Sequence, residues 1–331
     1  MLFLTRGLLL CAAIAGFQVG CGSRPGDEIL TVRAEGFQPT CVALDLDGRR
    51  LATGENPGGG NYDCQVKIWN AKSGKLMLRM SGHSSDVSCV AFSPDGTTLA
   101  SASMESVKLW NANTGRLLHS FDQHALPAWS VAFSPDGKRF AASASKANGV
   151  EAMVIVWDVS TGAQAYRIVK PDWRPYGVAF SPDGNFLATT SNGDDHTLDI
   201  WEAQTGRSVR MVKVVTDGLG SVAFSPDGQR LVTSGASAKV WETSTGRNIL
   251  TLDGYGEGYW HAVFSPDGKR IAAGSGSGDV RIWDSVSGQE IRYLRGRDSF
   301  SSARSVAFSP DGRRLVSVSM LAGIRVWDVA P

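Results

Sequence analysis

One seven-residue motif recurs along this chain and constrains its fold more than any other feature. Val-Ala-Phe-Ser-Pro-Asp-Gly begins at Val90, Val131, Val178, Val222 and Val306. A variant runs 262–268, and a worn copy, Val-Ala-Leu-Asp-Leu-Asp-Gly, runs 42–48. Each copy is followed by an alternating run that ends in a tryptophan: Trp69, Trp110, Trp157, Trp201, Trp241, Trp283 and Trp327. Repeats of roughly 40–45 residues are typical of arrays built from one small structural unit.

Each repeat predicts four short antiparallel strands. Val-x-Phe alternates with period two, which indicates a buried strand. In Ser-Pro-Asp-Gly, Pro presets φ and Gly takes the positive φ that closes a turn. In the second repeat, Thr98–Ser103, Val107–Trp110 and Leu117–Phe121 supply the next three strands. Four such strands make one blade of a β-propeller, so the sequence predicts an all-β, seven-bladed propeller.

The two ends of the chain predict how the ring closes. Trp327 ends the third strand of the seventh repeat, and only four residues follow it. Before the first repeat, residues 28–33 read Glu-Ile-Leu-Thr-Val-Arg, an additional strand. Pairing of this strand with the seventh blade would remove the two edges that an open array leaves exposed. We therefore expect one propeller over residues 28–331, closed by its N-terminal strand.

The repeats resemble the WD40 family over about residues 28–331. Phe-Ser-Pro-Asp-Gly occurs together with Val-Trp-Asp at 156–158 and 326–328. TolB-like and lactonase-like propellers share Ser-Pro-Asp-Gly, but a tryptophan at the end of all seven third strands favours WD40. The resemblance implies a non-enzymatic scaffold without a cofactor. Its protein or peptide partner would bind the face that carries the loops between blades, which we call the top face.

Residues 1–20 are interpreted as a signal peptide and 21–27 as a short linker. Arg6 precedes a mostly apolar run, Leu8–Phe17, which is too short to span a bilayer comfortably. The run ends in Val-Gly-Cys-Gly around Cys21, which resembles the lipobox of bacterial lipoproteins. We therefore expect an exported protein, anchored in the cell envelope by lipid on Cys21. Plain secretion and a retained N-terminal anchor are the alternatives, because Gln18 replaces the usual Leu.

Candidate binding residues occur four positions before the repeat Phe or Leu. The seven residues there are Thr40, Ser88, Trp129, Tyr176, Gly220, Trp260 and Arg304. The resemblance places this position near the mouth of the central channel, and aromatic and Arg side chains are favoured in binding hot spots. We therefore predict a partner-binding set on the top face: Trp129, Trp173, Tyr176, Trp260 and Arg304. Two alternatives stay open: these rings only cover the core, or they bind a glycan.

The composition gives little support to other functions. With 33 basic and 32 acidic residues and no basic block, the chain lacks the footprint of a nucleic-acid binder. No phosphate-binding, nucleophile-elbow or zinc-protease motif is present. Cys41, Cys64 and Cys89 predict neither a disulfide framework nor a zinc site. We expect a monomer without a metal. A propeller hydrolase or lactonase, the alternative, would need carboxylates, His or a metal at the channel mouth.

A WD40 hydrogen-bond network is expected to be largely absent. In the family it links a His before the first strand, a Ser on the second, an Asp in the following loop and the repeat Trp. Only His83 and His124 match the His position, and Met104 stands at the Asp position of the His83 blade. Asp63 and Asp195 lie in blades without the His. We therefore expect apolar packing and strand pairing to hold the blades.

Overall fold

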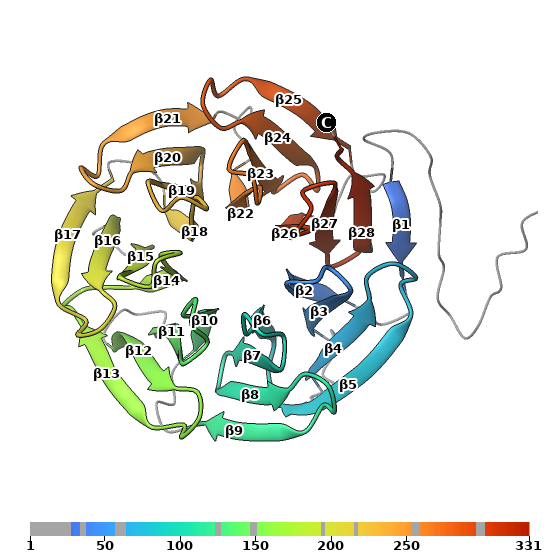
Figure 1. Cartoon of the computed structure of the whole chain (residues 1–331), viewed down its shortest axis with the longest axis horizontal. Helices are drawn as coiled ribbons and strands as arrows, with labels where there is room; N and C mark the ends of the chain where they lie inside the picture. Colours follow the sequence, from blue (N-terminus) through green and yellow to red (C-terminus); the bar gives the residue numbers. More distant parts are fainter. Residues whose placement is uncertain are drawn as a thin grey trace, which may run out of the picture.

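The computed structural model shows a ring of seven four-stranded antiparallel sheets around a central channel (Figure 1). It describes residues 28–33, 38–56, 64–122, 127–145, 151–192, 196–214, 218–252, 258–295 and 302–330. All elements in these ranges are strands. The predicted all-β, seven-bladed propeller is therefore confirmed.

Within each blade the strands run from the channel to the outer wall. The innermost are β2 (Pro39–Leu44), β6 (Val87–Phe92), β10 (Ala128–Phe133), β14 (Pro175–Phe180), β18 (Leu219–Phe224), β22 (Tyr259–Phe264) and β26 (Ala303–Phe308). The second strands are β3 (Arg50–Glu55), β7 (Thr98–Ser103), β11 (Arg139–Ser145), β15 (Phe186–Ser191), β19 (Arg230–Gly235), β23 (Arg270–Ser275) and β27 (Arg314–Ser319). Blades are numbered 1 to 7 in this order.

The third strands carry the repeat tryptophans. They are β4 (Cys64–Asn70), β8 (Val107–Asn111), β12 (Ala152–Asp158), β16 (Thr197–Glu202), β20 (Ala238–Glu242), β24 (Val280–Asp284) and β28 (Gly323–Asp328). The outermost strands are β5 (Leu76–His83), β9 (Leu117–Phe121), β13 (Gln164–Val169), β17 (Ser208–Lys213), β21 (Asn248–Leu252), β25 (Glu290–Leu294) and, in blade 7, β1 (Glu28–Val32).

Strand β1 closes the ring, as predicted. It pairs antiparallel with β28, with Leu30 opposite Val326 and Val32 opposite Ile324. Leu30 and Val32 are buried and belong to the hydrophobic cluster that joins blade 7 to blade 1. Glu28 forms an ion pair with the buried Arg325 at 3.4 Å. Blade 7 is thus assembled from both ends of the described chain (Figure 1).

Tryptophan-centred clusters between neighbouring blades form the core. Trp110, for example, is buried with Met80 of blade 1 and Leu99 of blade 2. In at least five blades the indole Nε1–H also donates to a hydroxyl on the second strand, at 2.8–2.9 Å: Trp69 to Thr53, Trp110 to Ser101, Trp201 to Thr189, Trp241 to Thr233 and Trp327 to Ser317. Because each blade packs only on its neighbours, stability is shared around the ring.

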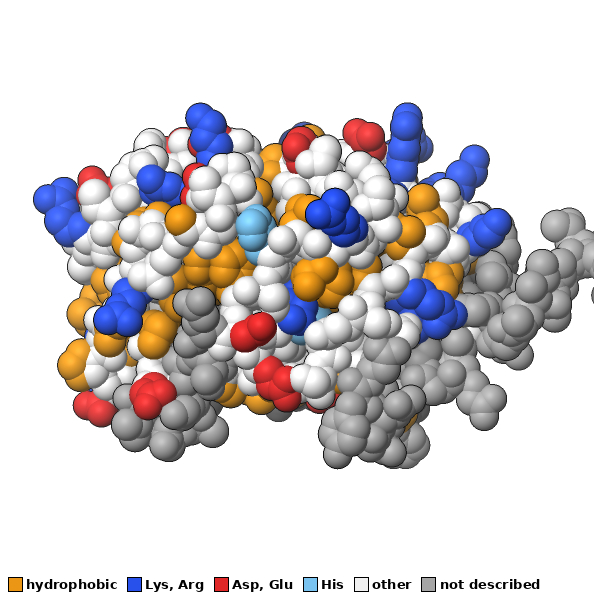
Figure 2. Space-filling view, turned by 90° about the horizontal axis from the view of Figure 1, so that it is seen from below, with side chains coloured by type: hydrophobic (Ala, Val, Ile, Leu, Met, Phe, Trp, Pro, Cys, Tyr) orange, Lys and Arg blue, Asp and Glu red, His pale blue; other side chains and the backbone are white. Residues whose placement is uncertain are grey.

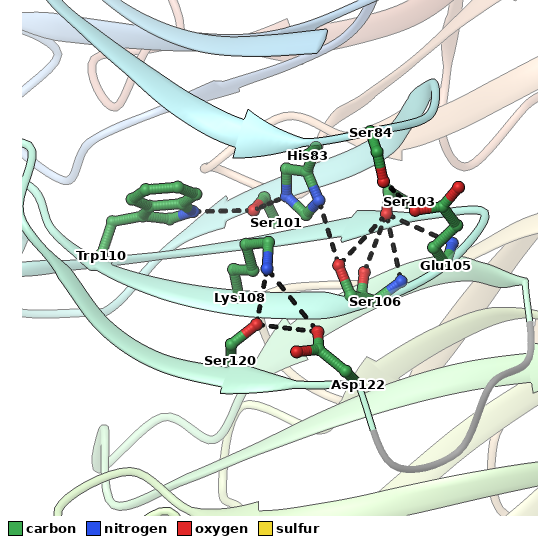
Figure 3. Close-up of polar contacts among 10 residues, drawn as sticks. All are labelled: His83, Ser84, Ser101, Ser103, Glu105, Ser106, Lys108, Trp110, Ser120 and Asp122. Atoms are coloured by element: carbon green, nitrogen blue, oxygen red, sulfur yellow. Dashed lines mark hydrogen bonds and ion pairs between the residues drawn. The ribbon is translucent and has the colours of Figure 1, made fainter. Parts of the chain in front are cut away.

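Blade 2 contains more of the family's hydrogen-bond network than the sequence predicts (Figure 3). His83 Nε2 lies 2.6 Å from Ser101 Oγ, which also accepts from Trp110 Nε1 at 2.8 Å. On its other side, His83 Nδ1 lies 3.3 Å from Ser106 Oγ. Ser106, rather than a residue at the position of Met104, thus takes the place expected for the Asp. The network of blade 2 is thus more complete than expected, although it contains Ser106 and no Asp.

The outer wall follows the alternation of a strand with one solvated face. Exposed hydrophobic side chains on it include Met77 on β5, Leu117 and Leu118 on β9, and Val169 on β13. Figure 2, which views the molecule from below relative to Figure 1, shows hydrophobic side chains on this side interspersed with polar and charged ones.

Several predicted features lie outside the described residues. These are residues 1–27 with Cys21, and most of the longer insertions between second and third strands, at 57–63, 146–150 and 193–195. His124 of blade 3 is also among them. In the part of the chain that is described, no helix is long and apolar enough to cross a membrane.

Candidate functional site

The central channel contains a cavity of about 460 Å³. Residues from all seven innermost strands line it, so every repeat contributes to one site. Six of the seven residues at the predicted mouth position line this cavity: Thr40, Ser88, Trp129, Tyr176, Trp260 and Arg304. The structure therefore brings these positions together around the channel, although it does not test whether they bind a partner.

A repeated backbone feature places these residues. Each is the second residue of its innermost strand, and in every blade the pairing register with the second strand shifts there. In blade 3, for example, the shift falls between Ala128 and Ser130, on either side of Trp129. A β-bulge redirects a side chain and commonly occurs at the rim of a closed sheet. In the six blades that have a side chain at this position, the bulge thus turns it toward the channel.

Hydroxyl groups of the preceding blade hold the bulged backbone in several places. Ser143 Oγ donates to the carbonyl of Tyr176 at 2.6 Å, and Ser234 Oγ donates to that of Trp260 at 3.0 Å. Ser88 Oγ likewise donates to the carbonyl of Ala128 at 2.6 Å. These bonds satisfy carbonyls that the register shift leaves unpaired within their own blade. The ring of side chains is therefore fixed from blade to blade before any partner arrives.

Two pairs of side chains dominate the mouth of the channel. The rings of Trp129 and Tyr176 stack, with centroids 5.4 Å apart and planes inclined by 24°. Trp129 Nε1 donates to Ser145 Oγ at 3.1 Å, which fixes the indole. The Arg304 guanidinium lies 5.6 Å from the centroid of Trp260, which is 47% exposed. Together the pairs present aromatic surface and one positive charge to solvent.

Trp173 was predicted to lie on the binding surface, and this prediction is wrong. Its side chain is fully buried in the cluster between blades 3 and 4, with its ring 5.7 Å from that of the repeat Trp201. The preceding residue, Asp172, has a φ of 52°, so the chain turns sharply there. This turn directs Trp173 into the core, while Tyr176 lies at the channel. His83 contacts Trp110 in a similar way in blade 2, with centroids 6.0 Å apart.

The cysteine and histidine side chains of the channel are held neutral. Burial, together with nearby Cys89, raises the pKa of the Cys41 thiol to about 12. Burial also raises the pKa of Cys89. His261 has its pKa lowered to about 4, again by burial. The described residues that line the cavity include no Asp or Glu, and no described cluster of His, Cys, Asp and Glu is suited to hold a metal ion.

This arrangement suits binding better than catalysis. A thiol with a raised pKa is a poor nucleophile at neutral pH. General acid–base chemistry needs a group that titrates near the working pH and reaches the substrate. The channel instead offers neutral polar groups, aromatic faces and the permanent charge of Arg304. Such surfaces recognise a partner by shape, stacking and hydrogen bonding.

Comparison with protein families gives a match over most of the chain. The family described as "WD domain, G-beta repeat" matches seven segments: residues 27–70, 74–111, 115–158, 171–202, 209–242, 246–284 and 288–328. Each segment contains one of the repeat tryptophans.

Individual relatives match over shorter stretches. Periodic tryptophan protein 2 of Saccharomyces cerevisiae is 35% identical over 71 residues, which are 22% of this chain and 7% of that protein. The human angio-associated migratory cell protein is 29% identical over 89 residues, 27% of this chain and 19% of that protein. The chain thus spans less than a fifth of the length of these curated relatives in the matched regions.

A solved structure shares the fold over nearly the whole chain. The β-propeller domain of Cps50 (Swd1) from Myceliophteria thermophila superimposes with a TM-score of 0.78. The match covers 92% of this chain and 99% of that one, at 19% sequence identity. At this identity the likeness concerns the fold alone.

Proposed function

The chain belongs to the WD40 repeat family, and we propose that it is a non-catalytic platform that binds a protein or peptide partner at the mouth of its channel. Propellers of this family typically act as protein-interaction scaffolds. The observation that carries the proposal is the bulged ring of side chains, which gathers Trp129, Tyr176, Trp260 and Arg304 at one opening.

The mouth indicates the chemistry of the partner. The stacked Trp129 and Tyr176 offer a fixed aromatic surface to an apolar side chain, at little cost in side-chain entropy. Arg304 offers a positive charge to a carboxylate or carbonyl group. A peptide segment with an apolar residue close to an acidic one meets both requirements. The neutral lining deeper in the channel supports binding over the hydrolase and lactonase alternatives.

The double variant Trp129→Ala/Trp260→Ala tests this site. Hot-spot truncation commonly costs about 2 kcal/mol or more, so we expect partner affinity to fall at least about tenfold. Partners captured by the immobilised wild-type protein from an envelope extract would be titrated against both forms. Tyr293→Ala is the matched control, because Tyr293 is 45% exposed but lies on the outer strand β25. Equal affinity of all three proteins would refute the channel-mouth site. If the double variant lost its binding of soluble oligosaccharides but kept its binding of peptides, a glycan would be favoured as the ligand.

We further propose that the propeller is exported and anchored in the cell envelope by lipid on Cys21. The apolar run before Cys21 and the small residues around it support this proposal. At about 3.3–3.6 Å per residue, the segment between Cys21 and Glu28 spans at most roughly 25 Å. The platform would then lie close to the membrane, attached through blade 7.

Cys21→Ser tests the anchor. Without the thiol, no acyl chain can be attached, so we expect complete loss of labelling by a fatty-acid analogue and release of the protein into the soluble fraction. Cys64→Ser is the control, because Cys64 is a buried thiol of the propeller. Undiminished labelling of the Cys21 variant would contradict the lipoprotein assignment.

A further inference from the structure

An arginine ties several neighbouring blades together on the face opposite the top face. It stands two residues after the Gly of the Ser-Pro-Asp-Gly turn or its equivalent, at the start of the second strand. Four blades use it: Arg50, Arg139, Arg230 and Arg270. Each donates to the carbonyl of the residue two positions after the repeat Trp in the next blade, namely Ala112, Ala203, Ser285 and Val329.

Each of these arginines enters a site made by the next blade, which we call the arginine socket. Arg230 Nη1 donates to the Ser285 carbonyl at 2.7 Å, and its Nη2 donates to the carbonyl of Gly268, in the turn, at 3.1 Å. The guanidinium also lies 5.2 Å from the centroid of the Phe264 ring. Arg50 and Arg270 make the same three contacts with blades 2 and 7. The socket therefore consists of two carbonyls and an aromatic ring.

The junction between blades 4 and 5 has the socket but not the arginine. Phe186 of blade 4 stands at the arginine position and has no donor to offer. The corresponding carbonyls of blade 5 belong to Gly228 and Thr243, and the corresponding ring is Phe224. Among the described residues, no side chain donates to either carbonyl. The Thr243 hydroxyl is also buried without a hydrogen-bond partner, whereas its counterpart Ser285 donates to Gly268 at 2.6 Å.

The other departures from the pattern differ from this one. Between blades 2 and 3 the position holds Thr98, which is itself buried. Between blades 7 and 1 it holds Arg314, which is exposed and faces a blade with Leu44 in place of the repeat Phe. At Phe186 the described residues combine a missing donor, two carbonyls to which no described side chain donates, and an open groove.

That groove has a volume of about 660 Å³. Phe186, Val209 and Ile249 give it apolar walls, and Gly228 and Thr243 line it. Asp183, Asp227 and Glu242 also line it, and hydrogen bonds from the turn lower the pKa values of the two aspartates, so both are ionised at neutral pH. The lining has two arginines, and both are engaged: Arg210 with the carbonyls of Ser244 and Thr245, and Arg230 with those of Ser285 and Gly268. The groove therefore carries an excess of negative charge over apolar walls.

We propose that this vacant socket binds an arginine side chain of a partner polypeptide. The three complete sockets of the same chain, those of Arg50, Arg230 and Arg270, show which group fits: a planar guanidinium that donates to two carbonyls at once. Lysine has only a point charge and cannot form this paired arrangement. The apolar walls suit the methylene stem of the arginine, and the carboxylates favour its charge. This second contact lies on the face away from the channel mouth and does not depend on the proposed top-face site.

The test uses N-acetyl-argininamide as the probe and the backbone amide resonances of Gly228 and Thr243 as the readout. We expect saturable shifts at both residues in the millimolar range. N-acetyl-citrullinamide has the same shape without the charge, and we expect it to bind roughly tenfold more weakly. N-acetyl-lysinamide should also bind more weakly, because it cannot bridge both carbonyls. Shifts of equal size with all three probes, or no shift at these residues, would overturn the proposal.

Two variants separate socket binding from a general attraction to negative charge. Phe186→Arg supplies the missing guanidinium from within the chain, so we expect it to abolish the probe shifts and to raise the melting temperature by about 2–4 °C. Thr243→Val keeps the shape but removes the unpartnered hydroxyl, and we expect a weaker affinity. Phe186→Leu is the matched control and should keep the affinity within about twofold. Undiminished binding by both Phe186→Arg and Thr243→Val would refute the assignment.

Discussion

Deletion of residues 28–33 is expected to lower the melting temperature by at least about 5 °C. The deletion removes β1 from blade 7 and exposes β28 along its whole length. It also removes the buried side chains of Leu30 and Val32, each worth about 1.5–3 kcal/mol, and leaves Arg325 without its ion-pair partner Glu28. For a chain of this size, 1 kcal/mol corresponds to about 1–2 °C. Thermal unfolding followed by circular dichroism measures the effect.

A point-variant comparison distinguishes ring closure from loss of an arbitrary segment. Leu30→Asp/Val32→Asp keeps the chain length but places two charges in the buried seam, and we expect most of the deletion's effect. Met77→Asp is the control, because Met77 lies on the outermost strand of blade 1 and is 51% exposed. If the deletion melts at the wild-type temperature, β1 does not contribute to closure.

The second large effect concerns pH. Burial, with a further contribution from the charge of Lys108, lowers the pKa of His83 to about 3 in the folded protein, whereas the unfolded chain has a value near 6.5. Below pH of about 6.5 the unfolded state binds a proton that the folded state does not. The free energy of unfolding therefore falls as the pH decreases, by up to about 1.4 kcal/mol per pH unit.

The variant His83→Asn isolates this contribution. It loses hydrogen bonds to Ser101 and Ser106 and should be less stable than the wild type at pH 7. Because it cannot take up the proton, the difference should shrink by about 2 kcal/mol between pH 7 and pH 5. Chemical denaturation at several pH values measures both curves. Stability curves of His83→Asn and the wild type that run parallel between pH 7 and pH 5 would contradict the assignment.

The sequence was sufficient to predict the fold because each repeat contains its own local signals. The Pro and Gly of the turn determine where the first strand ends, and the Trp marks the end of the third. Counting repeats then showed that blade 7 lacked a strand and that residues 28–33 could supply it. The mouth position was predicted for a similar reason: one offset from the repeat Phe applies in every blade.

The sequence-based predictions failed where a side chain contacts a different strand or loop from the one that carries it. Trp173 lies only three residues from Tyr176, but the turn at Asp172 directs it into the core. Ser106 binds His83 although it does not stand at the expected offset from Trp110, because the loop of blade 2 is short. The sequence did not predict the socket at Gly228 and Thr243 either. Each arginine lies in one repeat and its acceptors lie in the next, so no pattern within a single repeat reveals the contact.

Ring closure by β1 also determines the order in which the protein can be completed. Leu30 is made almost three hundred residues before its partner Val326. During synthesis, the first strand to emerge therefore has no partner until nearly the whole chain has followed. Pairs so distant in sequence form slowly, and unpaired strand edges favour association between chains in the meantime. A chaperone that shields residues 28–33 until β28 emerges would therefore increase the yield of folded protein.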